Sequence, residues 1–484
     1  MHLVRDPIPR LIRQIAVPFA LGMFFNTMFN VTDTFFAGRL STDALAALSL
    51  SFPMFFLVLG PGIGIQTGAT ALISNALGAG DDRRAVRYNV QAVTLAVMVT
   101  AVITVVMHLV LPALYRFFGA EGEVLAGGLR YMRVIASGGI VIVLSQVLNA
   151  GLVARGDTKA YRNVLVVAAI LNVGLDPLLM FGLTIAGRQI IPPLLEGGTA
   201  IATVGLQGLG VVYLVGRGRS RRVYDGARFR DFLPDRTILR ELVGQSAPAA
   251  LDFLILTLGA FVLNYFISDF GRNAIAAYGA SLRIEQIALM PLFGISVALS
   301  TLVGQNNGAQ RLDRVVESFR TSIRISIVAA VAILVPVLLA AAPILRLFTD
   351  TAEVVTIGRR YLYIQGITYF SYILMNLSNA VLRGLKKPVM IMWIGLYRQA
   401  AAPFLVFPLL AYTLGMEVDG VFWGLAIVNW SAAAFTYWWA RRRLNDARRR
   451  AGSYPAPDEP TEEPVASANL RPDEPARAAG VPAR

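Results

Sequence analysis

Long apolar runs constrain this sequence more than any other feature. They recur from residue 11 to residue 440, and each is close to the ~20 residues that a helix needs to cross a bilayer core of ~30 Å. That core holds no water to pair with the backbone, so each span must be a helix or part of a closed barrel. The runs are continuous rather than alternating, which predicts helices. The chain is therefore expected to be an all-α polytopic membrane protein.

The positive charge follows the connectors between the runs. The net charge is +14, and every second connector is basic while those between are nearly balanced or acidic, as the positive-inside rule describes. This pattern predicts a multi-pass protein in a lipid bilayer with both termini cytoplasmic, and no nucleic-acid partner. The basic connectors contain Arg83, Arg84 and Arg87; Arg155, Lys159 and Arg162; residues 217–232; Arg311 and Arg314; Arg383, Lys386 and Lys387; and residues 440–450.

Counting the runs between basic connectors predicts twelve spans. The first six lie near 11–38, 44–77, 88–112, 128–154, 161–183 and 199–216, and the last six near 241–268, 274–306, 319–341, 358–382, 389–414 and 420–440. The resulting division is a cytoplasmic N-terminus (1–10), an N-lobe (11–216), a basic cytoplasmic linker (217–240), a C-lobe (241–444) and a tail (445–484). The tail is rich in Pro, Glu and Ala, which predicts disorder.

An internal repeat relates the two halves of the chain. Shifting the sequence by 230 residues places "LGPGIGIQTGATALISNALGAG" (59–80) on "LMPLFGISVALSTLVGQNNGAQ" (289–310), and Pro18 on Pro248. Because six spans separate equivalent points, the halves have the same orientation. The sequence thus predicts two pseudo-symmetric six-helix lobes built as parallel repeats, an architecture typical of alternating-access transporters.

Polar stripes run along five spans of the first half. The spacing of their members places each set on one helix face. We expect a substrate cavity lined by Asn26, Asn30, Gln146, Asn149 and Gln207. The stripes are Asn26, Asn30 and Asp33; Gln66 and Thr70; Gln146 and Asn149; Asn172 and Asp176; and Thr199, Thr203 and Gln207.

Two of these stripes carry an acid inside a membrane span. A central carboxylate costs about 2.5–3.5 kcal/mol on insertion scales, so such residues are usually functional. By the repeat alignment Asp33 falls on Leu263, and Asp176 falls on an apolar stretch around Phe404, so the second half keeps the architecture without these acids. Two carboxylates facing one cavity repel and readily take up a proton. Neighbouring amide and hydroxyl oxygens fit Na⁺ equally well, so H⁺ and Na⁺ both remain open.

Several segments, taken in order, resemble the multidrug and toxic compound extrusion (MATE) transporters. They are "DTFFAGRLSTDALAALSLSFP", "RGDTKA", "LNVGLDPLLMFG", "RIEQIALMP" and "LVGQNNGA". The resemblance covers about 11–444 and is strongest to the prokaryotic branch with an N-lobe cation site. It implies a bacterial or archaeal cytoplasmic-membrane antiporter that expels small amphipathic or cationic compounds in exchange for H⁺ or Na⁺. It implies no cofactor beyond the coupling ion.

The resemblance also assigns roles to individual positions. Asp33, Asn172, Asp176 and Thr203 fall where the family's N-lobe cation site lies, so Na⁺, if it is the ion, would bind there. Asn149 falls nearby, and Pro18 falls on the proline associated with bending of the first helix.

The second half carries secondary candidates of its own. They are Asp252, Glu285, Tyr369 and Asn376, and we expect Asp252 to pair with Arg283 as a structural bridge.

Other classes of protein fit the sequence less well. A lipid-linked oligosaccharide flippase of similar architecture would hold phosphates with basic residues, whereas the first-half stripes are acidic. A membrane-embedded enzyme would need a catalytic constellation, and none of the motifs for metal, nucleophile or cofactor sites occurs. The chain has no cysteine and only two histidines. We expect a monomeric transporter rather than an enzyme.

Overall fold

The apolar runs form long helices. Most of these helices extend beyond the predicted spans at one or both ends. The computed structural model describes residues 2–185 and 188–452. The first half comprises α1 (Ile8–Leu40), α2 (Thr42–Gly78), α3 (Asp82–Phe117), α4 (Gly122–Ser137), α5 (Gly139–Ala154), α6 (Lys159–Phe181) and α7 (Glu196–Ser220). The second half comprises α8 (Arg236–Ser268), α9 (Arg272–Gly308), α10 (Leu312–Leu339), α11 (Ala341–Arg346), α12 (Ala352–Gly384), α13 (Val389–Leu396), α14 (Pro403–Pro408) and α15 (Glu417–Gly452).

Short polar residues mark where several helices begin. Ser41 accepts a hydrogen bond from the Ala44 amide at the start of α2, and Asp81 accepts one from Arg84 at the start of α3. Asp235 accepts from two amides at the start of α8. These side chains satisfy amide groups that the first turn of a helix leaves free.

The described helices account for eleven of the twelve predicted spans by length and composition. Within the described residues, ten helices are long and apolar enough to cross a membrane, and the pair α4–α5, bent by 47° at Gly138, makes an eleventh. The remaining predicted span, 358–382, lies in α12, which is 33 residues long but more polar than those helices, so the count of twelve stays a prediction. The predicted all-α polytopic fold is confirmed.

The repeat is visible in the helix ends. The helices α2 (Thr42–Gly78) and α9 (Arg272–Gly308) begin and end 230 residues apart. The pair α4–α5 (122–154) and the single helix α12 (352–384) show the same offset. The bend at Gly138 therefore distinguishes the first repeat, because the equivalent part of α12 is continuous.

Three segments depart from continuous helices. A small antiparallel hairpin, β1 (Leu183–Ile185) with β2 (Arg188–Ile191), fills the long connector between α6 and α7. The predicted span 389–414 is α13 and α14 interleaved with two π-helical segments, η2 (Tyr397–Ala401) and η3 (Leu409–Thr413). A 3₁₀ turn, η1 (Phe229–Phe232), lies in the connector between the lobes. In the predicted tail, α15 continues to Gly452, and 453–484 lie outside the described residues.

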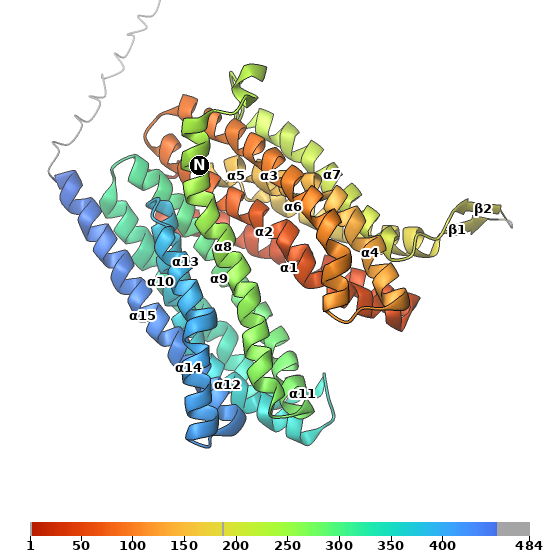
Figure 1. Cartoon of the computed structure of the whole chain (residues 1–484). Coiled ribbons are helices and arrows are strands. Elements are labelled where there is room, and N and C mark those ends of the chain that lie inside the picture. The colour runs from red at the N-terminus through yellow and green to blue at the C-terminus, as the bar shows by residue number, and fades with distance from the viewer. Residues whose placement is uncertain (1, 186–187, 453–484) are drawn as a thin grey trace, which may run out of the picture.

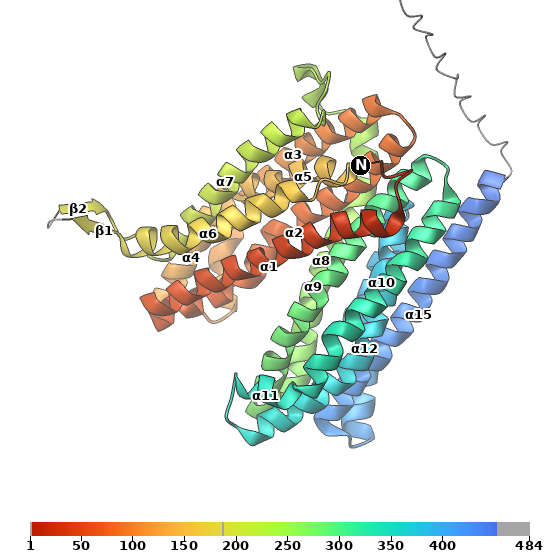
Figure 2. The ribbon, with the colours of Figure 1, turned by 180° about the vertical axis from the view of Figure 1, so that it is seen from behind.

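The two lobes meet at one end and diverge at the other. Figures 1 and 2 show α1–α7 and α8–α15 as two bundles that converge near the N-terminus and separate toward α4 and α11. The converging end carries the basic connectors and is called the basic end below. The opposite end is called the splayed end.

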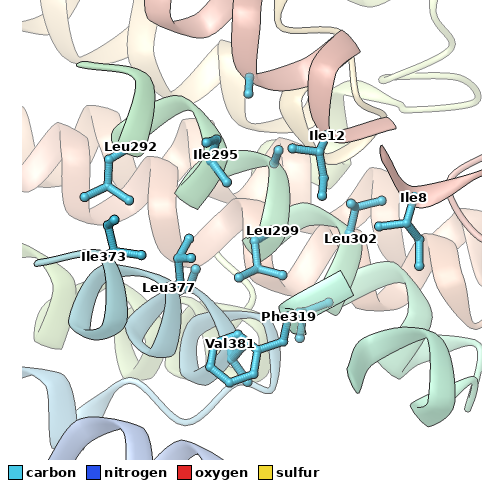
Figure 3. Packing of buried hydrophobic residues seen from close by; sticks show 14 of the residues in the cluster. Ile8, Ile12, Leu292, Ile295, Leu299, Leu302, Phe319, Ile373, Leu377 and Val381 are labelled. Carbon is cyan, nitrogen blue, oxygen red and sulfur yellow. The ribbon is translucent and has the colours of Figure 1, made fainter. Parts of the chain in front are cut away.

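The lobes exchange the beginnings of their first helices. The start of α1 packs into the largest apolar cluster of the C-lobe, and the start of α8 packs into an apolar cluster of the N-lobe through Ile238 and Leu242. Figure 3 shows the first of these clusters, in which Ile8 and Ile12 of α1 lie among C-lobe residues Leu292, Ile295, Leu299, Leu302, Phe319, Ile373, Leu377 and Val381.

Candidate functional site

Two acids from separate helices meet at one amide group in the N-lobe. The Asn172 side-chain nitrogen donates to Asp33 Oδ1 at 2.6 Å and to Asp176 Oδ2 at 3.1 Å. An asparagine amide has two N–H donors, so one group serves both carboxyls and holds them within about 6 Å, where like charges oppose each other. Asp33 is 7% exposed, and Asn172 and Asp176 are fully buried.

Neither acid is neutralised by a basic side chain. Ten ion pairs join the described residues, and none includes Asp33 or Asp176. Isolated carboxylates are costly inside a membrane. No basic side chain of the described chain offsets the charge of either carboxyl.

Several buried oxygens of α6 and α7 have no hydrogen-bond partner within the described residues. Asp176 Oδ1 and Asn172 Oδ1 have no hydrogen-bond partner, and neither do the hydroxyls of Thr199 and Thr203 on α7. Buried polar atoms are nearly always hydrogen-bonded, so these oxygens are free to accept a further partner.

The two threonines lie at the same depth as the acids. Gly198 of α7 packs against the backbone of Leu179 on α6, and Gly210 packs against Val164. The two helices thus run antiparallel, and this register places Thr199 and Thr203 beside the turns of α6 that carry Asp176 and Asn172. The predicted set is brought to one level, with carboxyl, amide and hydroxyl oxygens available.

Sequence reasoning missed Tyr131 of α4 as a site residue. It is 8% exposed and lies close enough to interact electrostatically with both Asp33 and Asp176. The sequence signal that could have identified Tyr131 is its alignment with Tyr361 in the repeat. Tyr361 donates a hydrogen bond to the buried Glu285 carboxylate at 2.7 Å. Each lobe thus places an equivalent tyrosine near a buried acid.

Other predicted N-lobe residues do not join the acid pair. Asn30 is exposed, and its amide donates back to the Asn26 carbonyl in the same helix at 2.8 Å. Gln207 accepts a hydrogen bond from Ser145. Gln146 is buried beside Gly62. Their predicted role as cavity lining stays a prediction.

Asn149 occupies a separate small cavity near Pro18. It is fully buried, and neither its amide nitrogen nor its oxygen has a partner. The cavity has a volume of about 10 Å³, which is room for a single water. It is lined by Phe19, Gly22, Met23, Asn149, Thr158, Tyr161, Arg162 and Leu165.

The C-lobe corrects one expectation. Asp252 pairs with Arg383 at 3.5 Å, so the predicted bridge to Arg283, which is exposed, is wrong. Arg383 lies in the last turn of α12, and Asp252 lies on α8. The pairing depends on helix packing rather than on nearness in the sequence.

The remaining C-lobe candidates have protein partners. Tyr369 donates to the Ala288 carbonyl at 2.7 Å, and the Asn376 amide donates to the Tyr372 carbonyl within its own helix. Arg398, in the π-helical segment η2, donates to Asn429 at 3.0 Å. Among these residues, Glu285 alone is a buried acid without an ion-pair partner in the described chain.

Chemically, the N-lobe arrangement suits a proton or a hard monovalent cation. The described residues contain no group of three or more His, Cys, Asp or Glu that could hold a metal ion. Two carboxyls with neutral amide and hydroxyl oxygens instead provide the oxygen ligands that hard cations prefer.

Comparisons with known proteins identify the fold and the family. The MatE family model matches residues 18–178 and again 248–409, one match in each repeat. A FAD transporter of Shewanella oneidensis is 28% identical over 448 residues, covering 91% of this chain and 96% of that protein. The probable multidrug resistance protein NorM of Thermotoga maritima is 27% identical, covering 79% and 82% respectively.

Solved structures agree on the fold. The outward-facing conformation of a multidrug resistance MATE transporter of the MOP superfamily superposes with a TM-score of 0.84, at 24% identity, covering 92% of this chain and 98% of that one. A MATE crystal structure in a bent conformation gives 0.85 at 23% identity, covering 93% and 98%. With the family model matching both repeats, the chain belongs to the MatE family and is a multidrug and toxic compound extrusion transporter, not an enzyme.

Proposed function

We propose that this transporter exports small amphipathic or cationic compounds in exchange for H⁺ or Na⁺, which binds at Asp33, Asn172 and Asp176. The observation that carries the proposal is the buried acid pair with partnerless oxygens around it. A bound cation would neutralise the repulsion between the carboxyls and give those oxygens a ligand. Thr203 and Thr199 lie at the depth needed to complete its shell.

The coupling follows from competition for negative charge. Buried carboxylates are costly in a membrane while they carry unbalanced negative charge. A cationic compound in the cavity lowers that energetic cost, and so does a coupling ion bound at the acid pair. Each therefore weakens the binding of the other, which is what exchange across alternating access requires. The basic end is cytoplasmic in this proposal, because its connectors carry the excess of arginine. The lobes, which converge at that end, are then closed to the cytoplasm.

Efflux from proteoliposomes tests the proposal. A cationic dye is loaded, and a pH gradient and a Na⁺ gradient are imposed in separate experiments. We expect dye efflux when one of the two gradients is imposed. We expect no efflux when neither gradient is present. Efflux that depends on neither gradient would contradict ion coupling.

Flavin nucleotide export is a second candidate. The relative from Shewanella oneidensis, which aligns over 91% of this chain, is described as a FAD transporter. The C-lobe also holds arginines within its spans, Arg283 and Arg398, which suit phosphate groups. In the same proteoliposomes, gradient-driven FAD efflux with no dye efflux would favour this candidate. Co-purified lipid-linked sugar would instead favour a flippase.

A further inference from the structure

The sequence motif that ends α9 has no role in the proposed cation site. Its residues "GQNNGA" (304–309) meet the equivalent end of α2, "SNALGAG" (74–80), at the basic end. The repeat relates Asn75 to Gln305 and Gly78 to Gly308. All four residues lie where the two lobes converge.

Two side-chain amides cross between the lobes at this point. The Asn75 amide nitrogen donates to the Gly384 carbonyl at 2.8 Å, and the Gln305 amide nitrogen donates to the Ala154 carbonyl at 2.7 Å. Ala154 and Gly384 are the last residues of α5 and α12, where helix carbonyls lack a partner in their own helix. Each lobe thus donates one side-chain amide hydrogen bond to a carbonyl at a helix end of the other lobe. The two bonds are equivalent in the repeat.

Glycines bring the two helix backbones into contact around these bonds. A Cβ atom on Gly78 would lie 1.9 Å from the Gln305 carbonyl oxygen, and one on Gly308 would lie 2.0 Å from the Asn75 carbonyl oxygen. No side chain fits at either position while the basic end is closed. The approach is symmetric, like the amide bonds.

We propose that Asn75 and Gln305 form a two-part clasp that holds the basic end closed and is released each time the transporter opens to that side. This inference rests on the proposed alternating-access function. Asn75 is 6% and Gln305 is 9% exposed, so opening would expose both amides and both carbonyls to water. Water replaces a neutral hydrogen bond at small net cost, whereas a buried ion pair is costly to break on one side. Amides therefore suit a contact that must form and break repeatedly.

Other polar contacts at the basic end need not break. Arg84 of α3 bonds Glu241 on α8, and at the equivalent position of the repeat Arg314 bonds the Asp6 carbonyl before α1. Both contacts join a lobe to the helix start already packed in its own core. They move with that lobe. The contacts that opening must break are the two clasp bonds, the bond that Asn307 donates to Asn75, and the bond that Gln245 donates to the Lys386 carbonyl.

Distances between spin labels test the clasp without transport. The chain has no cysteine, so cysteines for labelling can be introduced without background. Arg83 with Arg320 reports the basic end, and Thr42 with Arg272 reports the splayed end; all four side chains are exposed. The measurement is the distance distribution of each pair by pulsed dipolar spectroscopy in lipid nanodiscs.

The variants are Asn75→Ala and Gln305→Ala, with Asn89→Ala as the matched control. The Asn89 amide is equally buried but bonds only the Ala85 carbonyl of its own helix. Each clasp variant is expected to raise the ratio of open to closed basic ends about two- to tenfold, the worth of one neutral hydrogen bond. The splayed-end distance should shorten in the same molecules. The control should lower thermal stability without moving either distribution.

Unchanged distributions in both clasp variants would overturn the proposal, as would an equal shift in the control. If the clasp variants do not fold, Asn75→Asp and Gln305→Glu replace them, because a carboxylate keeps the shape of the amide but has no N–H to donate to the Gly384 and Ala154 carbonyls. Basic-end distances that equal those of the wild type in both of these variants would overturn the clasp, and a larger open fraction would support it. The spin-label distances are measured without drug or coupling ion. The test of the clasp therefore remains valid even if the proposed cation site proves wrong.

Discussion

At the scale of single residues, Asn172 organises the candidate site. Its amide is the group that both acids share, and its own oxygen remains without a partner. The spacing of Asn172 and Asp176 on one helix predicted their common face. Asp33 comes from a helix 139 residues earlier in the chain, so the three-residue contact depends on how α1 packs against α6.

Replacing Asp176 with asparagine is expected to abolish gradient-driven efflux while leaving folding intact. The amide has the shape of the acid but cannot take up a proton or give a charge to a cation. Asp252→Asn is the matched control, because its carboxylate is already paired with Arg383. That change should lower stability by about 1–3 kcal/mol, the cost of leaving a partly buried polar group without its partner, and preserve transport. Wild-type efflux by Asp176→Asn, or a folded but inactive Asp252→Asn, would contradict the assignment.

At the scale of helices, α1 joins the two lobes across its proline. Its beginning packs in the C-lobe core, and the rest of it packs on α6 of the N-lobe. Pro18 lies between these parts and removes a backbone hydrogen bond. The nearby Ile15 carbonyl accepts a bond from Thr158 at 2.8 Å, so the weakened turn is supported from α6. This placement makes Pro18 the expected point of bending.

Pro18→Ala is expected to stiffen α1 and to narrow the distance distribution between labels at Thr42 and Arg272. Alanine restores the hydrogen bond that proline lacks, a gain of about 3 kcal/mol in a helix interior. The measurement compares wild type and variant at acidic and neutral pH. Distributions that are the same in both proteins and at both pH values would rule out bending as the coupling step, although the cation site could still stand.

The crossing of α2 and α9 makes a second helix-scale prediction. Gly78→Ala should prevent closure of the basic end, because its Cβ would lie 1.9 Å from the Gln305 carbonyl oxygen. Gly174→Ala is the control, since a Cβ there meets nothing within 4 Å. The control should raise stability by up to about 1 kcal/mol, the usual helix preference for alanine. Equal effects of the two changes on the basic-end distance would contradict the close packing.

At the scale of the whole molecule, the exchanged helix starts tie the lobes together. Ile12 is 1% exposed and lies in the C-lobe cluster, although it belongs to the first repeat. Leu242 is fully buried in the N-lobe cluster, although it belongs to the second. The two positions are equivalent in the repeat. The lobes can therefore turn about these segments but cannot separate without exposing both cores.

Ile12→Ala is expected to destabilise the C-lobe rather than the N-lobe. A buried isoleucine truncated to alanine costs about 2–5 kcal/mol, and the residues around it come from α9, α10 and α12. Hydrogen exchange should therefore quicken in those helices and stay unchanged in α3 and α5. Faster exchange confined to α3 and α5 would show that the start of α1 belongs to its own lobe.

The sequence by itself determined the helical membrane fold, the repeat and the acids that are candidates for coupling. These follow from the hydrophobicity of each run and from spacing along one helix, which are local properties. The tertiary structure alone decided that Asn172 bridges two helices, that Tyr131 lies near both acids, and that Asp252 pairs with Arg383 rather than Arg283. It also decided the exchange of helix starts and the two amide bonds between lobes. Such contacts depend on the rotation and crossing of helices far apart in the chain, and no local pattern encodes that packing.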